Sequence, residues 1–354
     1  MRSKQEIPTP ALLLDLDAFE ANLARMAEQI ERSGKNLRPH SKAHKCVEIA
    51  KRQIAAGARG ACVATVHEAE AMAQGGIPDL LLTSPLADPR AMARLAATGA
   101  MAVVDHAQQA SWYNEAARAA GRTLDVLIDL DVGDHRTGAR STEQAVEIAQ
   151  AIDRAANLRL RGLQAYSVEG SHAGGPDKAA RQRVSRQAFE IAAETQHALK
   201  RLGLAAEILT GGSTGTWDID TCIPHVTELQ AGSYVLMDMA YAKLRLPFRH
   251  ALAVMTTVVS TNHAGFVTVD GGFKSFSTDR GYGPQAPALP GSAYRWGGDE
   301  FGYLDVKECA VKPRLGERIE FIPPHCDPTV NLYRSIHACR GDRVEEVWPV
   351  HSGK

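Results

Sequence analysis

The sequence lacks the features that mark membrane proteins, nucleic-acid-binding proteins and secreted proteins. It has no apolar run of roughly 18 residues, so no membrane-spanning helix is expected. Basic and acidic side chains number 40 and 41, and the resulting net charge of −1 gives no general attraction to nucleic acid or to a membrane surface. The N-terminal segment MRSKQEIPTP has no apolar stretch of the kind found in secretory signals.

Cysteine is also sparse and is not arranged in pairs. The 354 residues include six cysteines and no CxxC motif, which is typical of reduced thiols and predicts a cytoplasmic protein. Hydrophobic residues form 44% of the chain and charged residues 23%, as in ordinary globular proteins. A chain of this length can form one large domain and a smaller one.

Strand-like and helix-like segments alternate from the N-terminal part of the chain to about residue 245. The predicted strands cover residues 36–42, 60–65, 79–84, 101–105, 124–131, 158–166, 206–210 and 226–230. Longer helices are predicted within residues 46–56, 141–155 and 177–201. Strands separated by helices predict parallel pairing, and eight strands can close a β/α barrel. A doubly wound open sheet is the competing arrangement.

The two ends of the chain are predicted to form a second, mostly antiparallel β domain. Strands are expected over residues 11–14, 252–261, 266–270, 318–322 and 344–348, with Gly/Pro-rich turns between the later ones. A helix follows the first of these strands, and Asp17 with Glu20 forms a capping-box pair at its start. The predicted barrel therefore spans residues 18–245, and residues 1–17 and 246–354 form the β domain.

Lys42 lies where the first barrel strand ends, in the segment LRPHSKAHK. Functional groups of a parallel barrel gather at the C-terminal ends of its strands. The neighbouring cations Arg38, His40, His44 and Lys45 are of the kind that lowers an amine pKa, as an amine that forms a Schiff base requires. The alternative interpretation is an ordinary basic surface loop.

The seventh strand ends in TGGSTGT, residues 210–216, which predicts a phosphate site. Gly212 allows the backbone to approach a ligand, and exposed N–H groups with the hydroxyls of Ser213 and Thr214 form an anion nest. A phosphate site after strands seven and eight recurs in such barrels. The eighth strand leads into AGSY, which offers Tyr234 as a further donor. A flexible loop is the alternative.

Three more candidates follow the fifth and sixth strands. Arg136, in DLDVGDHRTG, is placed to reach a ligand oxyanion, although a solvated arginine is nearly as common. The segment AYSVEGSH supplies Tyr166 and His172. A lone histidine in a glycine-flanked loop is most often structural, but this one is expected at the same face of the barrel.

The β domain contains a candidate metal site in the segment IPPHCDPTVN. On an extended backbone His325 and Asp327 would point to the same side and Cys326 to the other. An imidazole with a carboxylate suits a divalent ion such as Mn²⁺ or Mg²⁺. A turn stabilised by the Asp-Pro sequence is the alternative.

Several segments together resemble the fold-type III pyridoxal-5′-phosphate (PLP) enzymes, which share the alanine racemase barrel. The closest subgroup comprises D-threonine aldolases with their relatives D-serine dehydratase and D-threo-3-hydroxyaspartate dehydratase. The likeness covers nearly the whole chain and is carried by TPALLLDLDAFEANL, RPHSKAHK, ATVHEAEAM, DVGDHRTG, GGSTGTW, AGSYVLMD and PPHCDPTVN. This order of motifs is far more specific than any one of them.

The resemblance implies roles for the cofactor residues. Lys42 would carry PLP covalently, Arg136 would contact its phenolic oxygen, and Tyr166 would lie near its ring. The phosphate would be held by Ser213, Thr214 and Tyr234.

The resemblance also implies a metal ion near the substrate, held by a histidine and a residue two positions further on. That second ligand is typically Asp in the aldolases and Cys in the dehydratases, so His325 and Asp327 match the aldolase form. A homodimer is implied as well. The chain departs from the usual pattern at His67 and Phe301, and either side chain could reshape the substrate pocket.

The expected activity is therefore retro-aldol cleavage of a D-3-hydroxy-α-amino acid to glycine and an aldehyde. In this hypothesis the metal ion binds the β-hydroxyl as a Lewis acid and His172 acts as general base. A dehydratase, in which Lys42 removes the Cα proton, is the alternative. A racemase would not need the metal pair, and a non-catalytic PLP-binding protein would usually lack the β domain.

Overall fold

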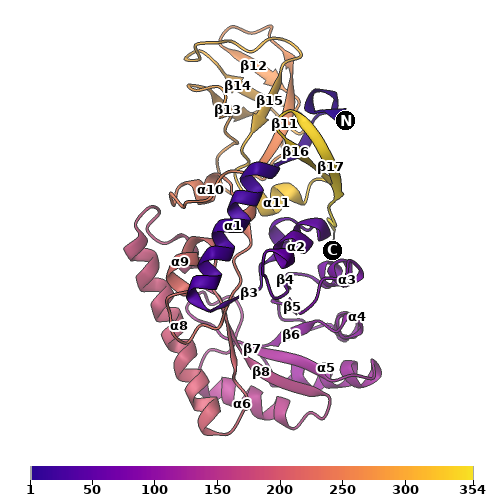
Figure 1. The fold of residues 1–354 in the computed structure, drawn as a ribbon, viewed down its shortest axis with the longest axis vertical. Coiled ribbons are helices and arrows are strands. Elements are labelled where there is room, and N and C mark those ends of the chain that lie inside the picture. The colour runs from indigo at the N-terminus through magenta and orange to yellow at the C-terminus, as the bar shows by residue number, and fades with distance from the viewer. Residues whose placement is uncertain (1, 354) are drawn as a thin grey trace. The chain divides into compact units, whose positions relative to one another are not determined.

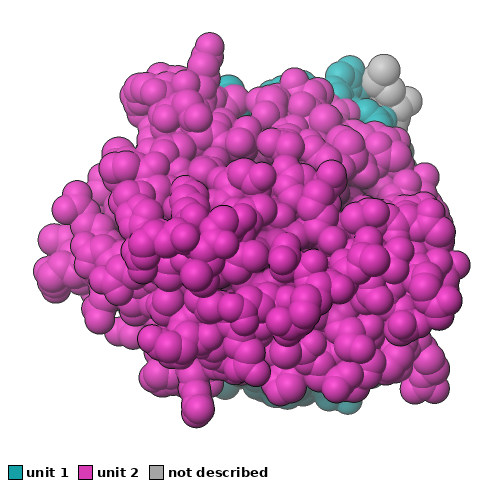
Figure 2. Space-filling model, turned by 90° about the horizontal axis from the view of Figure 1, so that it is seen from below, with its two compact units in different colours: residues 1–25, 43–46, 233–353 teal, residues 26–42, 47–232, 354 magenta. Residues whose placement is uncertain are grey.

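The structure is a computed structural model that describes residues 2–353. It divides into two compact units, drawn in teal and magenta in Figure 2. Of the described residues, unit 1 comprises 2–25, 43–46 and 233–353, and unit 2 comprises 26–42 and 47–232. No helix within these residues is long and apolar enough to span a membrane.

Unit 2 contains an eight-stranded parallel sheet in the order β3-β10-β9-β8-β7-β6-β5-β4. Its strands are β3 (Asn36–Leu37), β4 (Ala61–Val63), β5 (Leu80–Leu82), β6 (Met101–Val104), β7 (Leu124–Asp129), β8 (Leu158–Ala165), β9 (Ile208–Gly211) and β10 (Glu228–Leu229). A parallel bridge joins His40, just after β3, to Cys62 of β4. This bridge links the two edge strands and closes the sheet, which confirms the predicted barrel and all eight strands.

Helices connect the barrel strands, as Figure 1 shows. They are α2 (Val47–Ala55), α3 (Val66–Gln74), α4 (Pro89–Thr98), α5 (Ala107–Ala119), α6 (Thr142–Asp153), α7 (Val168–His172), α8 (Lys178–Arg201) and α9 (Trp217–Asp220). Polar side chains fix several of the helix starts: Thr65, Asp88, Ser141 and Asp177 each accept a hydrogen bond from a backbone N–H of the first turn.

Alternate strand residues face opposite sides of the barrel wall, and both sides are apolar. One set packs with the helices and includes Val63, Leu82, Val104 and Ile128. The other set forms a smaller cluster and includes Cys62, Leu81, Val103 and Leu127. Because both faces are buried, these strands appear in the sequence as continuous apolar runs. This pattern is why they could be predicted.

Unit 1 is built on a nine-stranded sheet in the order β1-β17-β16-β2-β11-β12-β14-β13, with β15 also paired to β11. Its strands are β1 (Arg2–Ser3), β2 (Ala11–Asp15), β11 (Leu252–Ser260), β12 (Phe266–Val269), β13 (Ala293–Trp296), β14 (Gly302–Asp305), β15 (Arg318–Phe321), β16 (Ser335–Arg340) and β17 (Arg343–Pro349). The pairs are antiparallel except β2 with β16. The N-terminal strand joins this domain, as predicted.

The helix after β2 begins differently from the prediction. Helix α1 (Leu16–Ser33) is capped by Asp15, whose Oδ1 accepts the backbone N–H three residues later at 3.0 Å. Asp17 and Glu20 therefore do not form a capping box, and both instead pair with Arg340 of β16. The prediction was wrong because a carboxylate two residues earlier already satisfies the first turn.

Candidate active site

A cavity of about 300 Å³ in unit 2 contains Lys42. The polar residues that line it include His40, Lys42, Thr83, Arg136, Tyr166 and Gln230. All of them follow the C-terminal ends of barrel strands, at β3, β5, β7, β8 and β10. The strand ends thus bring together side chains that are far apart in the sequence, as the barrel geometry predicts.

Two of the predicted site residues lie near the ring of Tyr166. The Lys42 Nζ lies 5.7 Å from the centroid of the tyrosine ring, and the Arg136 guanidinium carbon lies 5.4 Å from the same centroid. Lys42 is half-buried within a single helical turn at Ser41–Ala43. An amine, an aromatic ring and a guanidinium therefore line the same cavity.

Two of the cations expected to act on Lys42 have other partners. Arg38 is buried and forms a bidentate ion pair with Glu228, in which both N···O distances are 2.9 Å. Its charge is thus compensated, so it cannot serve as a free cation beside the lysine. His40 lies closer to the cavity, with Nε2 2.9 Å from the Thr83 Oγ1.

A buried polar network that the sequence analysis missed supports the cavity. The Gln164 Nε2 donates to the Asp129 Oδ1 at 2.8 Å and to the Thr83 carbonyl at 2.9 Å, and its Oε1 accepts from Gln230 at 3.1 Å. Burial raises the pKa of Asp129 to about 6, although Gln164 and Thr137 hydrogen-bond its carboxylate. The only sequence signal is polar residues at the ends of apolar strands.

The loop after β9 fits an oxyanion. Gly212 has a φ of +74°, and a Cβ there would clash with the Asp220 Oδ2. The Thr214 Oγ1 is buried and has no hydrogen-bond partner among the described residues, which leaves it free to donate to a ligand. The Ser213 hydroxyl accepts the Gly215 N–H at 3.1 Å. Glycine, an unsatisfied hydroxyl and a tight turn together fit a phosphate group.

Five of the predicted cofactor-binding and catalytic residues do not line the Lys42 cavity: Gly212, Ser213 and Thr214 of the loop after β9, and also His172 and Tyr234. His172 is the last residue of α7 and is half-buried, but it is not among the side chains that line the Lys42 cavity. Tyr234 belongs to unit 1, where it is buried with its ring centroid 5.7 Å from that of Phe248. Their roles stay predictions.

The predicted metal pair adopts a backbone different from the expected one. His325 precedes helix α11 (Cys326–Val330), so Asp327 lies in the first helical turn and not on an extended strand. The extended prediction was wrong because proline at position 328 is compatible with a first helical turn. The two side chains still approach each other, with 4.0 Å between the His325 Nε2 and the Asp327 Oδ1.

The surroundings of His325 partly fit a divalent ion. Asp279 accepts from Nδ1 at 2.8 Å, which leaves the lone pair of Nε2 on the side of Asp327. The Arg280 Nη2 lies 3.5 Å from Nε2, so a bound ion would require this guanidinium to turn aside. Residues 2–353 offer no group of three or more His, Cys, Asp or Glu side chains for a metal. Within these residues a bound ion would therefore have two protein donors here, His325 and Asp327.

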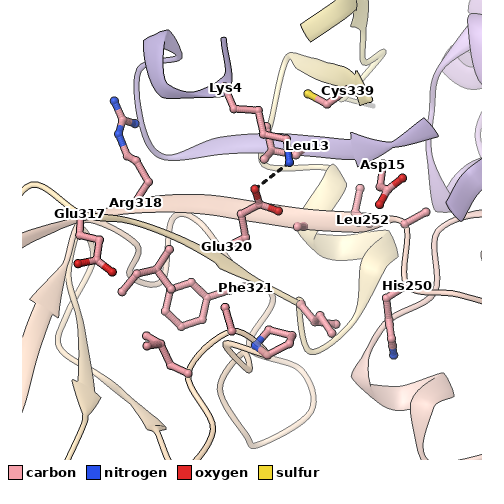
Figure 3. A pocket seen from close by; sticks show the side chains of 17 residues that line it. Lys4, Leu13, Asp15, His250, Leu252, Glu317, Arg318, Glu320, Phe321 and Cys339 are labelled. Carbon is pink, nitrogen blue, oxygen red and sulfur yellow. Dashed lines mark hydrogen bonds and ion pairs between the residues drawn. The ribbon is translucent and has the colours of Figure 1, made fainter. Parts of the chain in front are cut away.

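Unit 1 also holds a larger cavity, of about 590 Å³, between β2, β11 and β15. Figure 3 shows its apolar side chains, among them Leu13, Leu252 and Phe321, and the ion pair between Lys4 and Glu320 at 2.9 Å. None of the predicted site residues lines it. Its size alone therefore does not make it the active site.

The barrel, the lysine at its first strand end and the oxyanion loop define an enzyme of the alanine racemase type. The chain belongs to this family, because the family model described as "Alanine racemase, N-terminal domain" matches residues 14–239. A second model, described as "Putative serine dehydratase domain", matches residues 251–339. The family supports PLP as the cofactor.

Relatives that match over nearly the whole chain define the reaction class further. D-threonine aldolase of Arthrobacter sp is 37% identical, over 97% of this chain and 92% of that protein. A 3-hydroxy-D-aspartate aldolase of Paracoccus denitrificans (strain Pd 1222) is 34% identical, over 98% and 92%. The solved D-threonine aldolase from Filomicrobium marinum has a TM-score of 0.94 at 37% identity, covering 99% and 98% of the two chains. The chain is thus a carbon–carbon lyase of this family.

A dehydratase also shares the fold. The solved D-threo-3-hydroxyaspartate dehydratase from a Delftia species has a TM-score of 0.91 at 26% identity, covering 100% of both chains. The same architecture therefore occurs with a second reaction on 3-hydroxy amino acids.

Proposed function

We propose that the chain is a PLP- and divalent-metal-dependent aldolase that cleaves D-3-hydroxy-α-amino acids of the D-threonine type to glycine and an aldehyde. The observation that carries the proposal is the cavity at the strand ends, where the Lys42 amine and the Arg136 guanidinium lie at the ring of Tyr166. The D-threonine aldolase of Arthrobacter sp, similar over nearly the whole chain, supports the same reaction class.

The proposed cofactor site uses residues of the cavity and of the oxyanion loop. Bound PLP holds the substrate through its amine and takes up the electron pair left on Cα when a bond to that carbon breaks. Lys42 supplies the anchoring amine, Tyr166 packs beside the ring, and Arg136 donates to the phenolic oxygen. The phosphate is proposed to be held by Gly212, Ser213, Thr214 and Tyr234.

Cleavage of the Cα–Cβ bond requires loss of the β-hydroxyl proton. His172 is proposed as the general base that removes this proton. The proposal rests on its position six residues after Tyr166, at the end of a short helix that follows β8. Near-wild-type turnover of His172→Ala would exclude the role.

A divalent ion, Mn²⁺ or Mg²⁺, is proposed to bind to His325 and Asp327. Such an ion supplies Lewis-acid chemistry toward the β-hydroxyl. The proposal is supported by the 4.0 Å separation of the two donor atoms and by the hydrogen bond that fixes the ring of His325 through Asp279. Asp327→Ala with an unchanged metal requirement would count against it.

A dehydratase that forms a 2-oxo acid and ammonia is the second candidate, favoured by the serine dehydratase domain match over residues 251–339. In this alternative Lys42 removes the Cα proton and the β-hydroxyl leaves. Asp327 favours the aldolase, because the resemblance associates Asp with the aldolases and Cys with the dehydratases at this position.

The deciding experiment identifies the products. Purified protein is incubated with D-threonine, D-phenylserine and D-3-hydroxyaspartate, before and after chelation and again after Mn²⁺ is added back. Glycine and an aldehyde support the proposed aldolase, and ammonia with a 2-oxo acid supports the dehydratase. Activity that survives chelation would contradict the metal requirement.

The protein is further proposed to be a cytoplasmic homodimer, and sedimentation analysis tests the assembly.

A further inference from the structure

A buried carboxylate lies behind the oxyanion loop and has no part in the proposed chemistry. Asp220, in α9, is fully buried, and its two oxygens have different partners. The Ser185 hydroxyl of α8 donates to Oδ1, and the Thr216 hydroxyl donates to Oδ2. The carboxylate is thus tied directly to the loop that is proposed to hold the phosphate.

The Thr216 hydroxyl continues this contact to Ser213. The two hydroxyl oxygens lie 3.1 Å apart, and either can be the donor. The Thr216 Oγ1 also accepts the Ser213 N–H at 3.2 Å, and the Ser213 Oγ accepts the Gly215 N–H at 3.1 Å. Asp220, Thr216 and Ser213 therefore form a chain of three side chains, which we call the hydroxyl chain.

The direction of donation along the hydroxyl chain depends on the proton count of Asp220. An ionised carboxylate only accepts, so the single hydroxyl proton of Thr216 points to it. Ser213 then keeps its hydrogen bond to Thr216 only by donating its own proton, so a ligand receives that proton only if this bond breaks. A proton on Oδ2 reverses each bond, so that Asp220 donates to Thr216 and Thr216 donates to Ser213. The Ser213 proton then becomes available to a phosphate oxygen.

We propose that Asp220 is a positioning residue whose proton, passed along the hydroxyl chain, decides whether Ser213 donates to the cofactor phosphate. This inference rests on the proposed function, because it takes the loop after β9 as the phosphate site. Protonation of Asp220 also removes a negative charge behind a bound anion. Both effects make the phosphate bind more tightly when Asp220 is neutral.

The surroundings of Asp220 allow both protonation states near neutral pH. Burial raises the pKa of Asp220 to about 7, against the opposing effect of its hydrogen bonds. Asp218, which pairs with Lys178 at 2.6 Å, adds a further raising effect. Arg181 of α8 donates to the Gly215 carbonyl at 3.0 Å. The remaining titratable side chains on the packed elements include those of Glu169 and His172 in α7.

The test measures PLP dissociation constants of the full-length protein and of Asp220→Asn between pH 6 and 8.5. The asparagine amide can donate permanently, as the neutral acid does, so the variant keeps Ser213 available at every pH. We expect the wild-type constant to rise by about ten- to a hundredfold relative to the variant as pH increases through the titration of Asp220. Taking this ratio cancels the titration of the cofactor and of Lys42. A ratio that stays constant with pH would overturn the inference.

Three further measurements test whether Asp220 acts on the phosphate through Ser213. Pyridoxal lacks the phosphate, so the same ratio measured with pyridoxal is expected to stay near one at all pH values. In a Ser213→Ala background the effect of Asp220→Asn is expected to shrink to the part that the removed negative charge contributes, and an undiminished effect there would show that Ser213 is not the mediator. Ser185→Ala removes a donor to the carboxylate, so the midpoint of the pH dependence should move upward.

The outcomes separate this inference from the function on which it rests. If PLP forms no reducible adduct with Lys42, the proposed function fails. If the adduct forms and the ratio does not change with pH, only the role of Asp220 fails.

Discussion

The Nδ1 atom of His325 lies 2.8 Å from the Oδ2 of Asp279. A carboxylate on one ring nitrogen fixes the tautomer and makes the other nitrogen a better metal ligand. We therefore expect Asp279→Asn to weaken Mn²⁺ binding by about 10- to 100-fold. Titration of the chelated protein with Mn²⁺ measures this. Asp299→Asn, a change on a bend outside the contacts of His325, serves as the control. Equal affinities in both variants would contradict the role of Asp279.

Lys42→Ala should remove the covalent attachment of the cofactor. The wild-type protein is expected to bind PLP with a visible absorbance band, because the link to Lys42 is a Schiff base. Borohydride reduction of this link should leave the cofactor permanently attached to the protein. Mass spectrometry of the reduced protein locates the adduct. Lys45→Ala, a neighbouring lysine whose Nζ donates to the Asn331 Oδ1 at 2.7 Å, should keep the adduct. A yellow, reducible and fully active Lys42→Ala protein would refute the assignment.

Gly212→Ala should impair the oxyanion loop. Its φ of +74° disfavours any side chain, and the new Cβ would clash with the Asp220 Oδ2. We expect a loss of about 1–3 kcal/mol in the free energy of unfolding, together with weaker PLP binding. Urea denaturation measures the first effect. Gly203→Ala, at φ +72° with nothing within 4 Å of its Cβ, separates backbone strain from the clash. Equal losses in both variants would mean that the contact with Asp220 contributes nothing.

The ion pair between Arg38 and Glu228 should be important for stability. Both side chains are buried, so Glu228→Gln leaves an uncompensated guanidinium and is expected to cost about 3–5 kcal/mol. The exposed pair between Arg118 and Glu115 provides the comparison, and Glu115→Gln should change stability far less because water screens this pair. Chemical denaturation should show a large loss of stability for Glu228→Gln and a small one for Glu115→Gln. A similarly small loss in both variants would argue that the buried ion pair is not important for stability.

Asp129 should make the fold less stable as pH rises. Its pKa is raised to about 6 in the folded protein, so the folded state binds its proton more tightly than the unfolded state does. The contribution of Asp129 to the free energy of unfolding is greatest below the pKa of this side chain in the unfolded state. It is lost as pH increases through about 6, by about 3 kcal/mol in total. Urea denaturation between pH 4 and 7.5 should therefore give a steeper decline for the wild type than for Asp129→Asn. Parallel pH profiles of the free energy of unfolding for the wild type and Asp129→Asn would rule out this effect of Asp129.

The sequence was most informative where side chains repeat a simple pattern. All eight barrel strands could be predicted because buried parallel strands are continuous apolar runs. Strands β1, β13, β14 and β16 were missed: β1 has two residues, β13 and β14 are short and half-exposed, and β16 has a mixed composition. Strand β16 also pairs with β2, a partner far along the chain.

The site was predicted less completely for a similar reason. Lys42, Arg136 and Tyr166 could be placed because barrel geometry brings strand ends together. The contact of Gln164 with Gln230 and that of His325 with Asp279 join residues separated by 66 and 46 positions. Neither pair has a local pattern that marks it. The helical turn at Asp327 was mispredicted because an extended backbone was assumed there, although the following proline is compatible with a first helical turn.

The pairing of β2 has a consequence for synthesis. This strand, Ala11–Asp15, leaves the ribosome well before its partners, but it lies between β11 and β16 in the sheet. At ~5–20 residues per second, its first partner emerges on the order of tens of seconds later. Throughout that interval a buried, apolar strand has neither neighbour. The nascent chain therefore has to keep this segment from pairing elsewhere, and we expect it to be the region most prone to aggregate during translation.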